Sequence, residues 1–365
     1  MSNARELAEL GSSYGTGGFV GMKNRIINGG MNISQRGTTA FTSTGGNFYT
    51  LDRWQVLGFG AVGKFTVQQT PSATETGYAT RVGAGFNNYL AVTSTSAYTL
   101  GATDIQSISQ SIEGFNVADL AWGTANAKTV TISFWVYSSL TGTFGGTVLN
   151  GAYNYSYPFT YTIPTANTWT QITLTIAGPT AGTWVGATNG NGVVLNFSFG
   201  TGSTYKGTAG AWTATGYYGA TGETNVTGTN GATFYITGVQ LEKGSTATSF
   251  DYRPYTTELQ LCQRYCAVWN ANLIGMMGQA ISTTQAILPL NYPVTPRTSA
   301  TGITSTGTFS VYGASAGGIG VTALAYNNAS DNQIQLVITV ASGLVAGNAT
   351  GLINGTKVIA TGMEL

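Results

Sequence analysis

Apolar and polar residues alternate along much of this chain, the pattern expected of β-strands with one buried face. In residues 128–137 every second position is apolar, and residues 168–176 repeat the pattern. Shorter runs of the same kind predict further strands at residues 63–69, 89–93, 192–199, 232–241, 308–312, 333–340 and 355–360. Many short strands separated by turns rich in Gly, Asn, Pro and Ser indicate an all-β fold built on an antiparallel sandwich.

Two segments depart from this alternation. Residues 104–113 carry isoleucines whose spacing also fits a helix, but their serine, glutamine and β-branched content favours a strand. Residues 256–269 predict the one convincing helix, capped by Thr256 or Thr257. Its apolar stripe consists of Leu259, Cys262, Cys266 and Trp269. We interpret this stripe as an assembly and packing seam, around a threefold axis, rather than a ligand site.

The chain divides into three parts. Residues 1–25 contain a short amphipathic stretch followed by a glycine-rich one, and we interpret them as an anchoring peptide. Residues 26–250 form the main β-domain. Residues 251–365 contain the helix and a smaller C-terminal β-sandwich-like domain. The segment at 200–231 is long, glycine-rich and aromatic, as binding or packing loops on a β-scaffold are.

The composition excludes several classes of partner. Only 7% of the residues are charged and the net charge is +1, where an ordinary soluble domain is about 25% charged. No basic run could attract nucleic acid. No apolar stretch is long enough to span a bilayer, and the N-terminus lacks the apolar core of a signal peptide, so we expect synthesis in the cytoplasm without membrane insertion. A near-neutral surface suits uncharged sugars, or close packing against copies of the same chain.

We expect no enzyme and no cofactor, and the sequence identifies no metal ligands, while a calcium ion held by backbone carbonyls and one acid stays an open alternative. The chain has no histidine, which excludes histidine-dependent triads and metal sites. Its two cysteines are four residues apart, a poor geometry for a disulfide. The acidic residues are scattered singly; Glu223 is the one in the long aromatic loop, and Asp52 and Asp251 stand beside Arg53 and Arg253 in local structural motifs. A polysaccharide depolymerase, which needs paired carboxylates, remains the third alternative.

Three segments together resemble tail-fibre-like proteins of bacteriophages, particularly marine and cyanobacterial ones. They are residues 24–37 with 49–54, residues 233–244 and residues 250–265. Between them, the strands that carry Trp135 and Trp169, with the closing residues 238–242, resemble the jelly-roll of family 4/9-type carbohydrate-binding modules. The resemblance covers roughly residues 20–270, and the part after Trp269 resembles the distal ends of that group only loosely.

The resemblance implies a virion protein with a carbohydrate-module-like jelly-roll sandwich. It implies a homo-oligomer, as a trimer, in which the N-terminal peptide contacts other virion proteins. The residues assigned to this virion anchor are Leu7, Leu10, Tyr14 and Phe19. The host partner implied is a cell-surface glycan.

Flat aromatic side chains in loops are the candidates for sugar binding, because rings can stack on the apolar faces of sugars. The aromatic residues that we select in this chain are Tyr153, Tyr155, Trp184, Trp212, Tyr217 and Tyr218. Aromatic residues are equally common in cores and subunit interfaces. Trp54, Trp135 and Trp169 lie in or next to strands, and we assign them to the core.

The low charge and the Gly-, Thr-, Ser- and Asn-rich composition suit two functions equally, of which the first is our leading hypothesis and the second the alternative. One is a fibre that attaches to host-surface glycans, and the other is a capsid decoration or head-fibre protein with no receptor of its own. The depolymerase tailspike comes third, because such proteins usually show a long parallel β-helix pattern.

Overall fold

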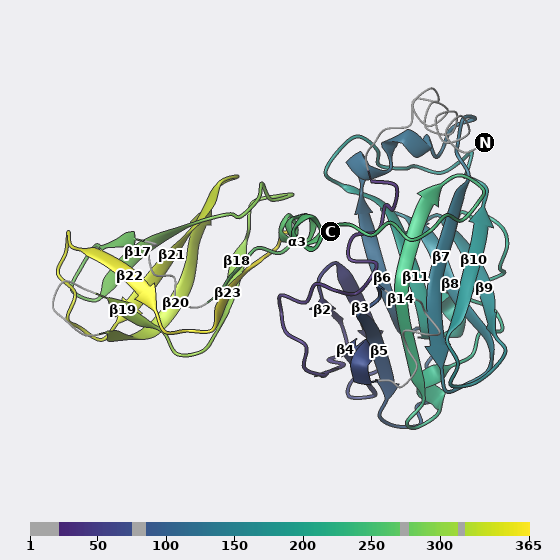
Figure 1. Ribbon diagram of the computed structural model, residues 1–365, viewed down its shortest axis with the longest axis horizontal. Helices are drawn as coiled ribbons and strands as arrows, with labels where there is room; N and C mark the ends of the chain where they lie inside the picture. Colours follow the sequence, from purple (N-terminus) through teal and green to yellow (C-terminus); the bar gives the residue numbers. More distant parts are fainter. Residues whose placement is uncertain (1–21, 75–84, 271–276, 313–317) are drawn as a thin grey trace, which may run out of the picture.

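Two stacked β-sheets make up the larger part of the molecule (Figure 1). The computed structural model describes residues 22–74, 85–270, 277–312 and 318–365. The first sheet has the order β1 (Phe41–Thr42), β4 (Phe65–Pro71), β5 (Asn88–Ser94), β14 (Thr233–Lys243), β7 (Val130–Ser138) and β10 (Thr170–Ile176). The second has the order β2 (Asn47–Leu51), β3 (Trp54–Phe59), β6 (Ile105–Glu113), β11 (Asn191–Thr201), β8 (Gly142–Asn150) and β9 (Ser156–Ile163). The predicted all-β jelly-roll sandwich is confirmed.

The core lies between these sheets and follows from the alternation along the strands. Phe134 from β7, Phe197 from β11 and Phe234 from β14 are almost completely buried there. The rings of Phe134 and Phe197 meet edge to face, with centroids 4.9 Å apart, a favourable geometry for aromatic pairs. Residues 104–113 contribute β6, so the strand interpretation of this segment is correct.

Short elements connect the long strands. They are the parallel pair β12 (Lys206–Gly207) and β13 (Gly219–Ala220), and the 3-10 turns η1 (Ser72–Thr74), η2 (Gly114–Asn116), η3 (Ala118–Leu120), η4 (Ser203–Tyr205) and η5 (Val226–Gly228). β13 lies against β8 and β9 on the outer face of the second sheet, whereas η5 contacts β5 and β11 and places Val226 in the core.

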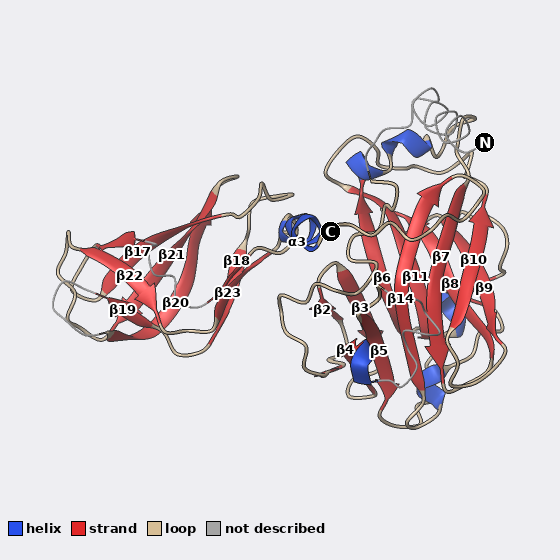
Figure 2. Cartoon of the chain, viewed as in Figure 1, coloured by secondary structure: helices blue, strands red, loops and turns tan. Residues whose placement is uncertain are grey.

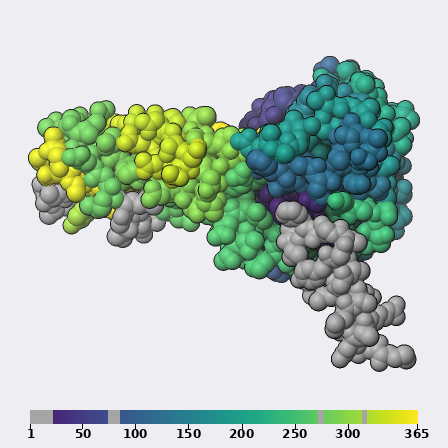
Figure 3. Space-filling view, turned by 90° about the horizontal axis from the view of Figure 1, so that it is seen from above, coloured from purple at the N-terminus to yellow at the C-terminus, as the bar shows by residue number. Residues whose placement is uncertain are grey.

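A second β-unit follows α3 (Tyr255–Gln263), the α-helix between the two β-rich parts in Figure 2. One sheet of this unit has the order β15 (Val268–Asn270), β23 (Lys357–Thr361) and β18 (Gly302–Thr306). Its closed barrel has the order β16 (Met277–Ala280), β17 (Gln285–Asn291), β21 (Gln333–Val340), β20 (Ile319–Ala329), β19 (Ser310–Tyr312) and β22 (Ala349–Ile353). The C-terminal β-domain thus takes the form of a small barrel, which projects from the sandwich in Figure 3.

The predicted helix is too long, and its cap is wrong. α3 ends at Gln263, and its N-cap residue is Pro254, without a side-chain capping hydrogen bond. Cys266 and Trp269 therefore lie beyond the helix, and Trp269 belongs to β15. Tertiary contacts outweigh the helical periodicity here, because the Ala267 carbonyl accepts a hydrogen bond from the Ala360 amide of the barrel unit at 2.9 Å.

The stripe that we assigned to assembly packs within the chain. Leu259 and Cys262 join Ile27 and Ile33 in a small apolar cluster against the sandwich. Trp269 lies in the core of the barrel unit instead. Both cysteines are free and buried, and burial raises the pKa of each thiol. Cys262, Cys266 and Trp269 are thus buried within the chain and Leu259 is partly buried, and a role of this stripe in assembly around a threefold axis stays a prediction.

The structure describes only the last residues of the predicted N-terminal anchor. The predicted anchor residues Leu7, Leu10, Tyr14 and Phe19 lie outside the described residues. Asn24 and Arg25, which the sequence assigned to the anchor, pack on β14, since the Asn24 Nδ2 donates to the Val239 carbonyl at 3.0 Å and the Arg25 amide donates to the Leu241 carbonyl at 2.9 Å.

Among the described helices, none is long and apolar enough to cross a membrane.

Candidate functional site

The outer face of the second sheet carries a row of polar side chains. Strand register places Gln55 opposite Ser109, Ser109 opposite Asn196, and Asn196 opposite Thr147. Successive residues of a strand point to opposite faces. Because the flanking Ile108 is in the core, these polar residues face outward.

A groove of about 280 Å³ lies on this face. It is lined by Asn47 from β2, by Gln55, Leu57 and Phe59 from β3, by Ser109, Val194 and Asn196 from β6 and β11, and by Tyr153, Tyr218 and Leu365. None of these lining side chains is charged. The groove therefore offers amides, hydroxyls and apolar surface, which suits an uncharged polar ligand.

Three polar atoms of this face lack a partner among the described residues, namely Asn196 Oδ1, Ser107 Oγ and Thr147 Oγ1. Asn196 is fully buried; its Nδ2 donates to the Tyr218 carbonyl at 2.6 Å, whereas its Oδ1 has no hydrogen bond. The Oγ of Ser107, which is paired with the groove residue Leu57, is likewise unpartnered. A buried polar atom without a hydrogen bond costs about 1–3 kcal/mol. A ligand that supplies hydroxyl groups here would recover part of that free energy.

Two stacked tyrosines form an aromatic wall. The rings of Tyr153 and Tyr218 are nearly parallel, at 9°, with centroids 6.2 Å apart. Tyr153 is 36% exposed, and its hydroxyl accepts a hydrogen bond from the Asn191 Nδ2 at 3.2 Å. Burial, with smaller effects of Tyr153 and Tyr205, raises the pKa of Tyr218 to about 12. Both the ring of Tyr153 and a neutral phenol of Tyr218 are thus present at the groove.

Glu223 fastens the segment that carries Tyr218 to the sheet. Its carboxylate accepts hydrogen bonds from the Ser198 Oγ at 2.7 Å and from the Ala220 amide at 3.0 Å. Burial raises its pKa, although these hydrogen bonds and Lys206 act in the opposite direction. Both carboxylate oxygens are therefore engaged in holding the loop. We assign Glu223 a positioning role.

The remaining aromatic candidates lie outside the groove. Trp122, Trp184 and Trp212, which we call the tryptophan cluster, pack edge to face with centroids 4.9–5.5 Å apart. Tyr155 stacks on Trp212 at 6.0 Å. The Trp184 and Trp212 indoles donate to main-chain carbonyls of Ala181 and Ala177. This geometry favours packing for these residues, and their role in binding stays a prediction.

Tyr217 also points elsewhere. Its ring lies close over Gly207, next to Pro158, where an added Cβ at Gly207 would meet it at 2.3 Å. Of the six aromatic candidates, the structure therefore brings Tyr153 and Tyr218 together at the groove. The core assignment holds for Trp54, which is fully buried, whereas Trp169 and Trp135 belong to an aromatic layer on the outer face of the first sheet.

Asn196, Ser109 and Gln55 were not selected from the sequence. The alternation along the strand could have indicated Asn196. Val193, Leu195 and Phe197 point into the core, so the side chain of Asn196 between them points to the outer face. Leu365 could not be found in this way, because it comes from the far end of the chain.

The described residues offer no metal centre, since no group of three or more Cys, Asp or Glu side chains gathers among them.

Comparison with known proteins found no matching family model. The search of curated proteins likewise found no match.

Solved structures do show similarity. A putative sugar binding protein from Bacteroides thetaiotaomicron is 11% identical with a TM-score of 0.34, covering 60% of this chain and 100% of that one. A family 11 carbohydrate-binding module from Clostridium thermocellum, in complex with a mixed-linked tetrasaccharide, is 12% identical with a TM-score of 0.27, covering 58% and 99%. The enzymatically active domain of tailspike protein 4 of bacteriophage CBA120 is 12% identical with a TM-score of 0.29, covering 61% of this chain but 22% of that one. Similarity at this level does not assign a ligand to the chain.

Proposed function

We propose that this chain binds a neutral glycan in the groove on the outer face of its second sheet. The observation that carries the proposal is the buried, unpartnered Oδ1 of Asn196 in a groove whose lining is uncharged. Sugars offer hydroxyl groups to such an atom and an apolar face to the wall of Tyr153 and Tyr218. A charged ligand would find no countercharge in the lining.

We further propose that binding serves attachment of a virion to its host, with the chain acting as a trimeric fibre. This part rests on the resemblance of residues 24–37, 233–244 and 250–265 to phage tail-fibre-like proteins. A binding role without catalysis is consistent with the groove, because the lining residues include no carboxylate. Glu223, which holds the segment with Tyr218, is occupied by its hydrogen bonds to Ser198 and Ala220.

The test uses the purified full-length chain and a panel of immobilised neutral polysaccharides from bacterial surfaces. We expect saturable binding to at least one of them, and loss of binding after periodate oxidation of the sugars. The variant Tyr153→Asn should weaken binding at least tenfold. Asparagine is chosen because Tyr153 has φ of 56°, a conformation that asparagine adopts more readily than other residues.

Tyr312→Asn is the matched control, since Tyr312 is 59% exposed on the barrel unit, away from the groove. Equal losses in both variants would contradict the assignment of the groove. No binding to any polysaccharide by the folded protein would overturn glycan binding and favour the decoration role. An antiserum against the chain separates these roles further, because it should block adsorption of particles only if the chain mediates attachment.

A further inference from the structure

The amide of Asn196 is held in one orientation in the groove. A side-chain amide has an N–H end that donates hydrogen bonds and an oxygen end that accepts them. The Nδ2 of Asn196 donates to the Tyr218 carbonyl at 2.6 Å, and a carbonyl can only accept. The buried Oδ1 is therefore the end that Asn196 offers to a ligand, and it is an acceptor.

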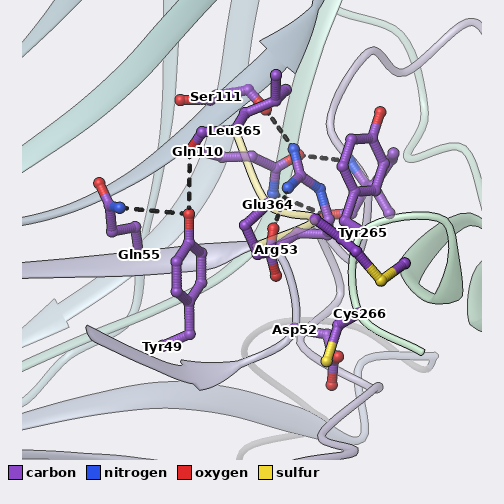
Figure 4. Close-up of polar contacts among 12 residues, drawn as sticks. Tyr49, Asp52, Arg53, Gln55, Gln110, Ser111, Tyr265, Cys266, Glu364 and Leu365 are labelled. Carbon is purple, nitrogen blue, oxygen red and sulfur yellow. Dashed lines mark hydrogen bonds and ion pairs between the residues drawn. The ribbon is translucent and has the colours of Figure 1, made fainter. Parts of the chain in front are cut away.

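A second groove amide, that of Gln55, is oriented by Tyr49, its direct partner in the register of β2 and β3. The Tyr49 hydroxyl donates to the Leu365 carbonyl at 3.3 Å (Figure 4). A tyrosine hydroxyl carries a single proton, so toward Gln55 it can only accept. It accepts a hydrogen bond from the Gln55 Nε2 at 3.3 Å. Within the part of the chain that the structure describes, the Oε1 of Gln55 forms no hydrogen bond, and it is the end available to a ligand.

The orientation of Tyr49 depends on the barrel unit, which supplies Leu365. The backbone before Leu365 is fixed, because Arg297 donates to the Met363 carbonyl at 2.9 Å and to the Glu364 carbonyl at 2.6 Å. Burial, together with the Glu364 carboxylate, raises the pKa of Tyr49. Its hydroxyl therefore keeps the proton that it donates, and the acceptor polarity of the neighbouring amide persists at neutral pH.

We propose that the groove selects glycans whose contacted hydroxyl groups are unsubstituted, and that it rejects O-methylated or O-acylated forms of the same glycan. Gln55 and Asn196 lie two strands apart, on either side of Ser109, which corresponds to about 10 Å. They therefore require a hydrogen-bond donor at two separate positions of the glycan.

A substituted hydroxyl has lost its proton, so it brings oxygen lone pairs against each amide oxygen and leaves the amide without a partner. The hydroxyl of Ser109 imposes no such requirement, because it can rotate to donate or to accept. Tyr49 acts through Gln55 and is a positioning residue. The inference rests on the proposed glycan binding and names the chemical state of the glycan that is recognised.

The probe is a set of short fragments, released by partial hydrolysis from the neutral polysaccharide that the wild-type chain binds best in the panel. One portion is left unmodified, and another is O-methylated on about three quarters of its hydroxyl groups. A fragment then keeps both contacted hydroxyls unsubstituted in about one case in sixteen. As a soluble competitor, the methylated portion should therefore be about sixteenfold less potent for the wild type.

Tyr49→Phe removes the hydroxyl that orients Gln55. The Gln55 amide can then turn and donate its N–H to a methylated oxygen, so only the contact with Asn196 still discriminates. We expect methylation to lower potency about fourfold in this variant. General damage to the groove would instead weaken both portions alike and leave their ratio unchanged.

Tyr326→Phe is the matched control, because the Tyr326 hydroxyl also donates to a carbonyl, that of Ala300 at 2.9 Å, and Tyr326 does not line the groove. It should keep the sixteenfold ratio. Thermal unfolding of both variants shows whether the fold is retained.

Each other outcome overturns a defined statement. Equal potency of the two portions for the wild type would overturn the requirement for unsubstituted hydroxyls, while glycan binding stands. A wild-type ratio that persists in folded Tyr49→Phe would overturn the positioning role of Tyr49. Absence of binding to every polysaccharide in the panel would overturn the proposed function and this inference with it.

Discussion

The indoles of the tryptophan cluster are engaged on their faces and at their polar edges. Trp184 packs between Trp122 and Trp212 and donates to the Ala181 carbonyl at 3.1 Å. Removing a large aromatic side chain from a packed site leaves a cavity, which typically costs 3–5 kcal/mol when burial is complete. Because Trp184 is only partly buried, we predict that Trp184→Ala lowers the free energy of unfolding by about 2 kcal/mol, measured by urea denaturation.

Tyr153→Asn provides the comparison, because it should weaken glycan binding while changing the free energy of unfolding by less than about 1 kcal/mol. The two variants therefore separate packing from binding. If Trp184→Ala instead keeps its stability and loses glycan binding, the tryptophan cluster is the sugar platform that the sequence indicated.

Glu113 is a titratable group whose effect on stability has a definite sign. Burial alone would raise its pKa, but hydrogen bonds from Arg264 and Tyr265 outweigh burial and lower the pKa. A carboxyl with a lowered pKa in the folded state stabilises the protein above its unfolded pKa of about 4.3, and this stabilisation is lost as pH falls through the folded value. We predict that the melting temperature of Glu113→Gln falls less steeply than that of the wild type below about pH 4.3.

The other acids titrate alike in the two proteins, so the difference between the two melting curves isolates Glu113. At neutral pH, Glu113→Gln should be less stable by about 2 kcal/mol, since the buried partner of Arg264 loses its charge. Parallel curves through the acid range would show that the Glu113 pair contributes nothing.

At the scale of elements, strand alternation predicted most of the sandwich. It identified the strands that became β7, β10, β11 and β14, and it implied which of their residues face inward. It did not reveal which outer face would hold a groove. The outer face of the first sheet carries the stacked rings of Tyr137 and Tyr235, 5.0 Å apart. The same alternation of apolar and polar residues therefore accompanies an aromatic layer on one sheet and a polar groove on the other. Loop residues decide which outer face holds a groove, and the positions of loops do not follow from the periodicity of the strands.

Periodicity alone also explains which residues of the candidate site the sequence analysis found and which it missed. Aromatic residues in loops were selected by type, which found Tyr153 and Tyr218 at the groove together with Trp184 and Trp212 in a packed cluster. The polar floor was missed because serine and asparagine in a strand carry no distinguishing signal by themselves. Only the register that aligns Ser109 with Asn196 makes them a site.

The segment that carries Tyr218 and β13 packs closely on Gly145 of β8, where a side chain would clash. A Cβ on Gly145 of β8 would lie 2.2 Å from the Glu223 Oε2 and 3.1 Å from the Ala220 amide. We predict that Gly145→Ala displaces the segment with β13, costs about 1–3 kcal/mol of stability, and weakens glycan binding through loss of the wall. Gly222→Ala tests the loop without a steric clash, because nothing lies within 4 Å of its added Cβ; its φ of 86° still imposes backbone strain.

Unfolding and binding are measured on both glycine variants. Gly145→Ala should lose more binding than Gly222→Ala at comparable stability. Equal binding by the two would indicate that the segment with Tyr218 is not part of the site.

At the scale of the whole molecule, buried ion pairs join the sandwich to the barrel unit. Arg53, from the turn before β3, is buried and contacts both Glu364 and the face of the Tyr265 ring, 3.6 Å from its centroid. Arg36 contacts Asp52 at 3.6 Å and Glu364 at 3.0 Å. The sequence suggested a local motif for Asp52 and Arg53, because adjacent opposite charges invite that interpretation. The two residues do form the turn between β2 and β3, and each side chain also pairs with a group elsewhere in the chain.

This junction predicts how the two units unfold. Removing one partner of a buried ion pair costs about 3–5 kcal/mol, so the sandwich and the barrel unit stabilise each other through Arg53. We predict one calorimetric transition for the wild type. In Arg53→Met the barrel unit should melt separately and at a lower temperature, because Glu364 is left with Arg36 alone.

Arg25→Met is the matched control, because Arg25 contacts Asp119 and the Asn116 carbonyl, both within the sandwich, and makes no ion pair with the barrel unit among the described residues. It should retain the single transition. Two transitions already in the wild type would contradict the coupling through Arg53.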